Sequence, residues 1–81
     1  MNHWRAWTSV ELGEAVRRAR KLKGWQQADL AELLGVTRMT VSRLERGESV
    51  GMDTALRALS ECGYGLVVTP KFAHVEVTDR G

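Results

Sequence analysis

Four stretches of the chain place apolar residues every three or four positions, and this period predicts four amphipathic helices between residues 8 and 63. The first helix follows a capping box that runs from Thr8 to Glu11, and the third follows the cap residue Thr37. Glycines just beyond the periodic stretches predict where the helices end: Gly24, Gly35, Gly47 and Gly63. The positions expected to face the core are Leu12, Ala15, Val16, Ala19, Leu22, Leu30, Ala31, Leu34, Val41, Leu44, Met52, Ala55, Leu56 and Leu59.

The pattern changes after residue 63, where apolar residues alternate instead of following a helical period. Tyr64, Leu66 and Val68 share one face, and Pro70 ends the run, which predicts one short β-strand. A single strand leaves its backbone hydrogen-bonding groups unpaired. It therefore requires a second strand, either from residues 75–78 or from a second copy of the chain.

Composition narrows the class of protein. Hydrophobic residues make up 43% of the 81 residues and charged residues 27%, which is typical of a small globular domain. No apolar run is long enough for a membrane span or a signal peptide, so we expect a cytoplasmic protein. The single cysteine, Cys62, excludes an intramolecular disulfide and a cysteine-built zinc site.

Catalytic chemistry is not expected. No nucleophile is followed or preceded by a plausible base, and the chain has no glycine-rich phosphate loop. His3 and His74 lie far apart in the sequence without other ligand residues around them, so we expect no metal. The sequence predicts a protein that is not an enzyme and that needs no cofactor.

The positive charge is concentrated in one half of the chain. The net charge is only +2, but the segment from Arg17 to Arg46 holds eight basic and three acidic residues. Such a segment is a candidate surface for a polyanion, although solvated lysines and arginines are common on helices.

The second and third predicted helices have the spacing of a helix-turn-helix. Leu30, Ala31 and Leu34 line the inner face of the first of the pair, and Gly35 lies at the turn between them. A tight turn fixes the angle between the two helices, so the second one projects and fits a DNA major groove.

Residues 24–37 and 41–47, with the sequences GWQQADLAELLGVT and VSRLERG, resemble the Cro/C1-type (XRE) helix-turn-helix family. The following MDTALRAL and GYGLVVTP resemble the HipB-like antitoxins of that family. The resemblance implies a mainly α fold, a compact four- or five-helix lambda-repressor-like domain with a C-terminal β-strand pairing across a dimer. It divides the chain into an N-terminal extension (1–7), a helix-turn-helix DNA-binding domain (8–63), a dimerisation strand (64–70) and a tail (71–81).

The expected DNA contacts lie on and beside the third helix. Its outward positions are Arg38, Met39, Ser42 and Arg43, with Thr40 at the edge of the same face. Arginine pairs with guanine, and the methionine and threonine methyl groups suit thymine. The resemblance adds the phosphate candidates Gln27, Thr37 and Arg46. It also implies an ion pair between Arg20 and Glu45. Arg17, Arg18, Lys21 and Lys23 are expected to be mostly solvated, with one or two of them reaching the DNA backbone from the end of the first helix.

One position departs from the family pattern. Gln26 stands where the family usually has a serine or threonine cap, and glutamine caps poorly, so a weaker start of the second helix is expected. For dimerisation we expect the strand residues Tyr64, Leu66, Val67 and Val68.

The resemblance implies a homodimeric repressor that binds a palindromic double-stranded operator, autoregulates its operon and holds a kinase-like toxin. Two alternatives stay open. One is a stand-alone XRE-type regulator without a toxin. The other is a protein-interaction module that inhibits a partner, which the apolar N-terminus and tail, with Trp4, Trp7 and Phe72, would favour.

Overall fold

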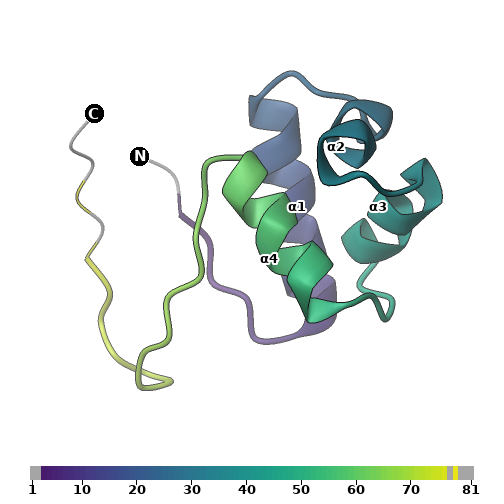
Figure 1. Ribbon diagram of the computed structural model, residues 1–81. Coiled ribbons are helices and arrows are strands. Elements are labelled where there is room, and N and C mark those ends of the chain that lie inside the picture. The colour runs from purple at the N-terminus through teal and green to yellow at the C-terminus, as the bar shows by residue number, and fades with distance from the viewer. Residues whose placement is uncertain (1–2, 77, 79–81) are drawn as a thin grey trace.

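The computed structural model describes residues 3–76 and 78, and within them it contains four helices and no strand. The helices are α1 (Ser9–Leu22), α2 (Gln27–Leu34), α3 (Arg38–Glu45) and α4 (Met52–Glu61). All four lie where the apolar period predicted them, and the mainly α fold is confirmed. α3 packs on α1 and α2, and α4 packs on the same two helices (Figure 1). None of these helices combines the length and the apolar character that crossing a membrane requires.

The predicted helix caps are present. The backbone N of Glu11 donates to Thr8 Oγ1 at 3.1 Å, and the backbone N of Thr40 donates to Thr37 Oγ1 at 3.2 Å. The Glu11 carboxylate accepts in return from the backbone N of Trp7, at 2.7 Å, rather than from that of the cap residue. Both caps satisfy N–H groups that a helix start leaves without a partner.

Each helix ends in the same way, with a glycine in the left-handed region just beyond it. Among the described residues, the glycines with positive φ are those predicted: Gly24, Gly35, Gly47 and Gly63. At the turn between α2 and α3, Gly35 has a φ of 68°, and the backbone N of Val36 donates back to the carbonyl of Ala31 at 3.0 Å. This is a Schellman motif, and it reverses the chain within two residues.

The core lies between the four helices. Its buried members are Val16, Ala19, Leu30, Ala31, Leu34, Val41, Leu44, Ala55, Ala58, Leu59 and Cys62. Three predicted core positions are wrong: Leu22, Met52 and Leu56 are 60%, 79% and 42% exposed. The buried face of α1 includes Gly13 and Arg20, and that of α4 includes Ala58, with Cys62 just after the helix. Both helices are therefore rotated about their axes relative to the predicted orientation, and this rotation turns the three large side chains outward.

Gly13 allows the backbones of α1 and α3 to touch. A Cβ atom at this position would lie 2.3 Å from the carbonyl oxygen of Leu44 and 2.8 Å from that of Glu45. No side chain fits there, so the last turn of α3 is pressed directly against α1.

The two terminal segments run beside each other along α1 and α4, away from α2 and α3 (Figure 1). Trp4 stacks on Tyr64 with ring centroids 5.1 Å apart, and Arg5 Nη2 donates to the carbonyl of Ala73 at 3.5 Å. The segment 64–70 forms no strand here, and neither do the described residues 75, 76 and 78; Val77 lies outside the described residues. Strand pairing across a dimer therefore stays a prediction.

Candidate nucleic-acid interface

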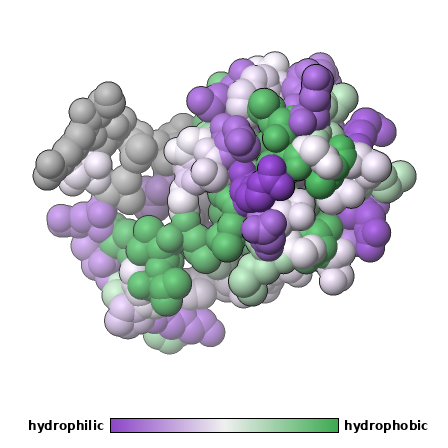
Figure 2. All heavy atoms as spheres, viewed as in Figure 1, coloured by the Kyte–Doolittle hydropathy of each residue, from purple (hydrophilic) through white to green (hydrophobic). Residues whose placement is uncertain are grey.

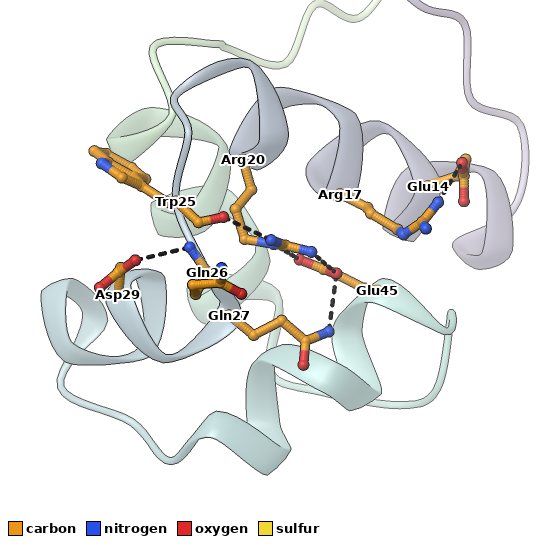
Figure 3. Close-up of polar contacts among 8 residues, drawn as sticks. All are labelled: Glu14, Arg17, Arg20, Trp25, Gln26, Gln27, Asp29 and Glu45. Carbon is orange, nitrogen blue, oxygen red and sulfur yellow. Dashed lines mark hydrogen bonds and ion pairs between the residues drawn. The ribbon is translucent and has the colours of Figure 1, made fainter.

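A buried ion pair fixes α3 to α1, as the sequence predicted. Arg20 Nε donates to Glu45 Oε2 at 2.6 Å, and Arg20 Nη2 donates to Glu45 Oε1 at 3.0 Å (Figure 3). The third guanidinium nitrogen donates to the carbonyl of Trp25 at 2.7 Å. The hydrogen bond with Glu45 and the negative charge of that carboxylate raise the pKa of Arg20 above its ordinary value, against the opposing effect of burial.

Gln27 joins α2 to the same pair. Its Nε2 donates to Glu45 Oε1 at 3.1 Å, so one carboxylate connects three helices (Figure 3). Every buried side-chain nitrogen and oxygen of the described residues has a partner. This network holds α3 at a fixed angle to α1 and α2 and leaves its opposite face free.

The start of α2 is stabilised by a residue of its own first turn. Gln26 makes no side-chain cap, but the Asp29 carboxylate accepts from the backbone N of Gln26 at 2.7 Å (Figure 3). Asp29 therefore stabilises the first turn, and its charge suits the positive end of the helix dipole. The weak start expected from the glutamine is offset by this second residue.

The free face of α3 carries the side chains predicted to meet DNA. Arg38, Met39 and Arg43 are exposed, and Thr40 and Ser42 are half-buried beside them. Met39 is 58% exposed, although a methionine costs solubility at such a position. Arg38 has no hydrogen bond or ion pair to any described residue, so its guanidinium is available.

Three of the predicted DNA contacts, Arg43, Arg46 and Thr37, already contact neighbouring side chains. Arg46 Nε lies 2.6 Å from Glu48 Oε2, and Arg43 Nε lies 3.5 Å from Glu48 Oε1. Thr37 Oγ1 lies 3.1 Å from Thr40 Oγ1, within hydrogen-bond distance.

A hollow of about 560 Å³ lies where α1 and the starts of α2 and α3 meet. Its lining residues are Arg17, Arg20, Lys21, Gln26, Gln27, Ala28 and Arg38. The sequence predicted that one or two of the basic residues at the end of α1 reach the DNA backbone but did not say which, and the structure places Arg17 and Lys21 beside Gln27 and Arg38. Their position one turn apart on α1, on either side of the predicted ion-pair residue Arg20, was the signal that could have found them.

The predicted dimerisation residues lie on the other side of the molecule. Tyr64 is half-buried against Trp4, whereas Leu66, Val67 and Val68 are 60%, 73% and 90% exposed. Figure 2 shows hydrophobic surface gathered over the terminal segments on this side. A hollow of about 380 Å³ lies between these segments and is lined by both of them.

Comparison with known proteins agrees with this geometry. A family model described as helix-turn-helix matches residues 16–68, most of the chain. The chain belongs to the helix-turn-helix family. This is a fold of DNA-binding transcriptional regulators, and its two helices correspond to α2 and α3. A protein of Pyrococcus furiosus, named as an HTH-type transcriptional regulatory protein, is 46% identical over 46 residues. That match covers 56% of this chain and only 15% of the longer relative.

Solved structures of similar fold include two HipB complexes. One is described as a HipB–O2 20mer complex, with a TM-score of 0.77 and 21% identity over 86% of this chain and 99% of that chain. The other, a HipA–HipB–O2–O3 complex, has a TM-score of 0.76 and 20% identity over 85% of this chain and 99% of that chain. At this identity the likeness shows the fold.

Proposed function

We propose that this helix-turn-helix protein is a sequence-specific transcriptional repressor that binds its operator as a homodimer. The observation that carries the proposal is the free face of α3, exposed in front and held behind by the network around Glu45. A helix that is fixed in this way enters the major groove without having to order itself first, which lowers the entropy cost of binding.

Arg38 and Met39 lie in the first turn of α3, the end that enters the groove most deeply in this motif. The Arg38 guanidinium, which has no partner among the described residues, forks onto guanine O6 and N7, and Met39 packs on a thymine methyl group. Ser42 and Arg43 follow one turn later on the same face.

Phosphate contacts position α3 in the groove. The hollow beside Gln27 carries the cations Arg17 and Lys21, and the start of α2 adds its helix dipole. We assign one phosphate of the DNA backbone to this hollow. Thr37 and Arg46 are the further phosphate candidates at the two ends of α3. Such contacts make operator affinity strongly dependent on salt.

The exposed apolar residues Leu66, Val67 and Val68 support a homodimer. Pairing of the two 64–70 segments as antiparallel strands would cover these side chains and satisfy their backbone groups. Two-fold symmetry then requires a palindromic operator with half-sites about 34 Å apart.

The likeness to HipB in its complex with HipA supports a role as an antitoxin that holds a kinase-like toxin and represses the shared operon. Co-expression of the neighbouring gene product with this chain tests the role, and a stable complex is expected. If the neighbouring gene encodes no kinase-like protein, the stand-alone regulator becomes the better assignment.

A gel-shift titration tests the DNA-binding function. The chain is titrated against the DNA upstream of its gene and against a random duplex of equal length, at several salt concentrations. The upstream DNA should bind at least about a thousandfold more tightly than the random duplex. Equal affinities would instead favour the protein-interaction module, which the exposed rings of Trp7 and Phe72 support.

A further inference from the structure

Glu48 lies among the arginines expected to meet DNA and is not itself part of any expected contact. We propose that Glu48 is an internal competitor for DNA phosphate: it holds Arg43 and Arg46 in the free protein and releases them when DNA binds. This inference rests on the proposed function and names the residue that sets the strength of binding.

The backbone fixes the position of Glu48. Its N–H donates to the carbonyl of Arg43 at 2.9 Å, and that of Gly47 donates to the carbonyl of Leu44 at 3.0 Å. These two bonds form the Schellman motif that ends α3. Gly47 has a φ of 79°, and a Cβ there would lie 2.5 Å from the Cα of Val10. The loop therefore cannot carry Glu48 away from α3 without losing the contact with α1.

From this position one carboxylate reaches two guanidinium groups. Glu48 Oε2 lies 2.6 Å from Arg46 Nε, and Glu48 Oε1 lies 3.5 Å from Arg43 Nε. Arg46 Nη1 also donates to Ser42 Oγ at 3.2 Å, and Arg43 Nη2 donates to the carbonyl of Ser49 at 3.4 Å. Both arginines are thus turned toward the loop that follows α3.

The stability of α3 does not explain why a carboxylate lies at position 48. It lies just past the C-terminal end of α3, where the helix dipole disfavours negative charge. The ion pairs are half-exposed, and such pairs contribute little to folding. The same arginines satisfy either the carboxylate or a DNA phosphate, so binding of DNA exchanges one for the other.

The test is a set of variants titrated against the upstream DNA and against a random duplex. Glu48→Gln removes the charge and keeps the size, and it should tighten binding to both duplexes about two- to tenfold. Glu61→Gln changes the net charge equally at the end of α4 and should leave affinity unchanged. Thermal unfolding of Glu48→Gln should stay close to that of the unmodified protein, because the substitution removes half-exposed ion pairs together with a charge that the helix dipole disfavours.

Two further variants separate contact from long-range repulsion. In an Arg43→Gln/Arg46→Gln background, the gain from Glu48→Gln should disappear. Glu48→Asp keeps the charge but shortens its reach, and it should gain part of the Glu48→Gln effect. The proposal is overturned if the gain persists without the arginines, or if Glu48→Asp binds like the unmodified protein. If the protein binds the two duplexes equally, the proposed repressor function is rejected, but the effect of Glu48 can still be measured on the random duplex. If the protein binds neither duplex, the repressor function and the role of Glu48 are both rejected.

Discussion

The Glu45 carboxylate, buried in the last turn of α3, accepts two hydrogen bonds from Arg20 on α1. The same oxygen that accepts from Arg20 Nη2 also accepts from Gln27. A buried ion pair often contributes little net stability, because removing two charges from water costs about as much as their attraction returns. We therefore interpret this pair as a device that sets the angle of α3.

Removing one partner of this pair should destabilise the fold strongly. Glu45→Leu leaves the Arg20 guanidinium buried without a counter-charge and should lower the free energy of unfolding by about 3–5 kcal/mol. The double variant Arg20→Met/Glu45→Leu should lose much less than the sum of the two single changes. Urea denaturation followed by circular dichroism measures all three variants. If Glu45→Leu lowers the free energy of unfolding by less than about 1 kcal/mol, the ion pair is not needed to hold α3 in place.

Gly13→Ala gives a test whose sign decides between two effects. Helix propensity alone favours alanine in a helix interior by about 1 kcal/mol. The contact with the carbonyl of Leu44 leaves no room for a Cβ, so we expect instead a loss of about 1–3 kcal/mol of unfolding free energy. Gly65→Ala is the matched control, since a Cβ there has nothing within 4 Å and should change stability little. A stabilised Gly13→Ala would contradict the close approach of α1 and α3.

Arg38→Ala should weaken operator binding by about 1–3 kcal/mol and relax the preference at one base pair. Arg38 is exposed and has no hydrogen bond or ion pair to any described residue, so the fold should be little affected. Arg18→Ala is the control, because Arg18 is exposed on α1 and lies 3.6 Å from Glu14. Gel shifts against operators changed at single base pairs measure the preference. A uniform loss across all operators would instead make Arg38 a phosphate contact.

The sequence predicted the helices well because their ends carry local signals. Thr8 and Thr37 cap, and glycines such as Gly35 stop the helices, so each boundary depends on a few adjacent residues. The Arg20–Glu45 pair was also predicted, through the resemblance to a family rather than through local spacing.

Contacts between elements were harder to predict, because they depend on how each helix is rotated and packed. The close approach at Gly13 and the hollow that brings Arg17 to Arg38 both join residues from different elements. The same rotation explains why Leu22 was wrongly assigned to the core.

The buried thiol of Cys62 should make stability fall at alkaline pH. Burial raises the pKa of this thiol, and the nearby charge of Glu45 adds to the effect. Since the folded pKa lies above the unfolded value of about 8.5, the fold favours the protonated thiol. Its contribution is full below about pH 8.5 and is lost as the pH rises through the folded value. The difference in unfolding free energy between the unmodified protein and Cys62→Ala, measured from about pH 7 to 10, should be constant at first and then shrink. If this difference stays constant over the whole pH range, the thiol has the same pKa in the folded and unfolded protein and the prediction is wrong.

The exposed valine at position 68 gives the sharpest test of the proposed dimer. Val68 is 90% exposed in the single chain, so Val68→Lys should leave the unfolding of the subunit unchanged. Within a paired strand the same lysine would place two like charges across the symmetry axis, which disfavours pairing. Leu22→Lys, which adds the same charge at an exposed site on α1, is the control. Sedimentation velocity should show a dimer for the control and a monomer for Val68→Lys, with weaker operator binding by the monomer. A dimer that survives Val68→Lys unchanged would place the interface elsewhere on the molecule.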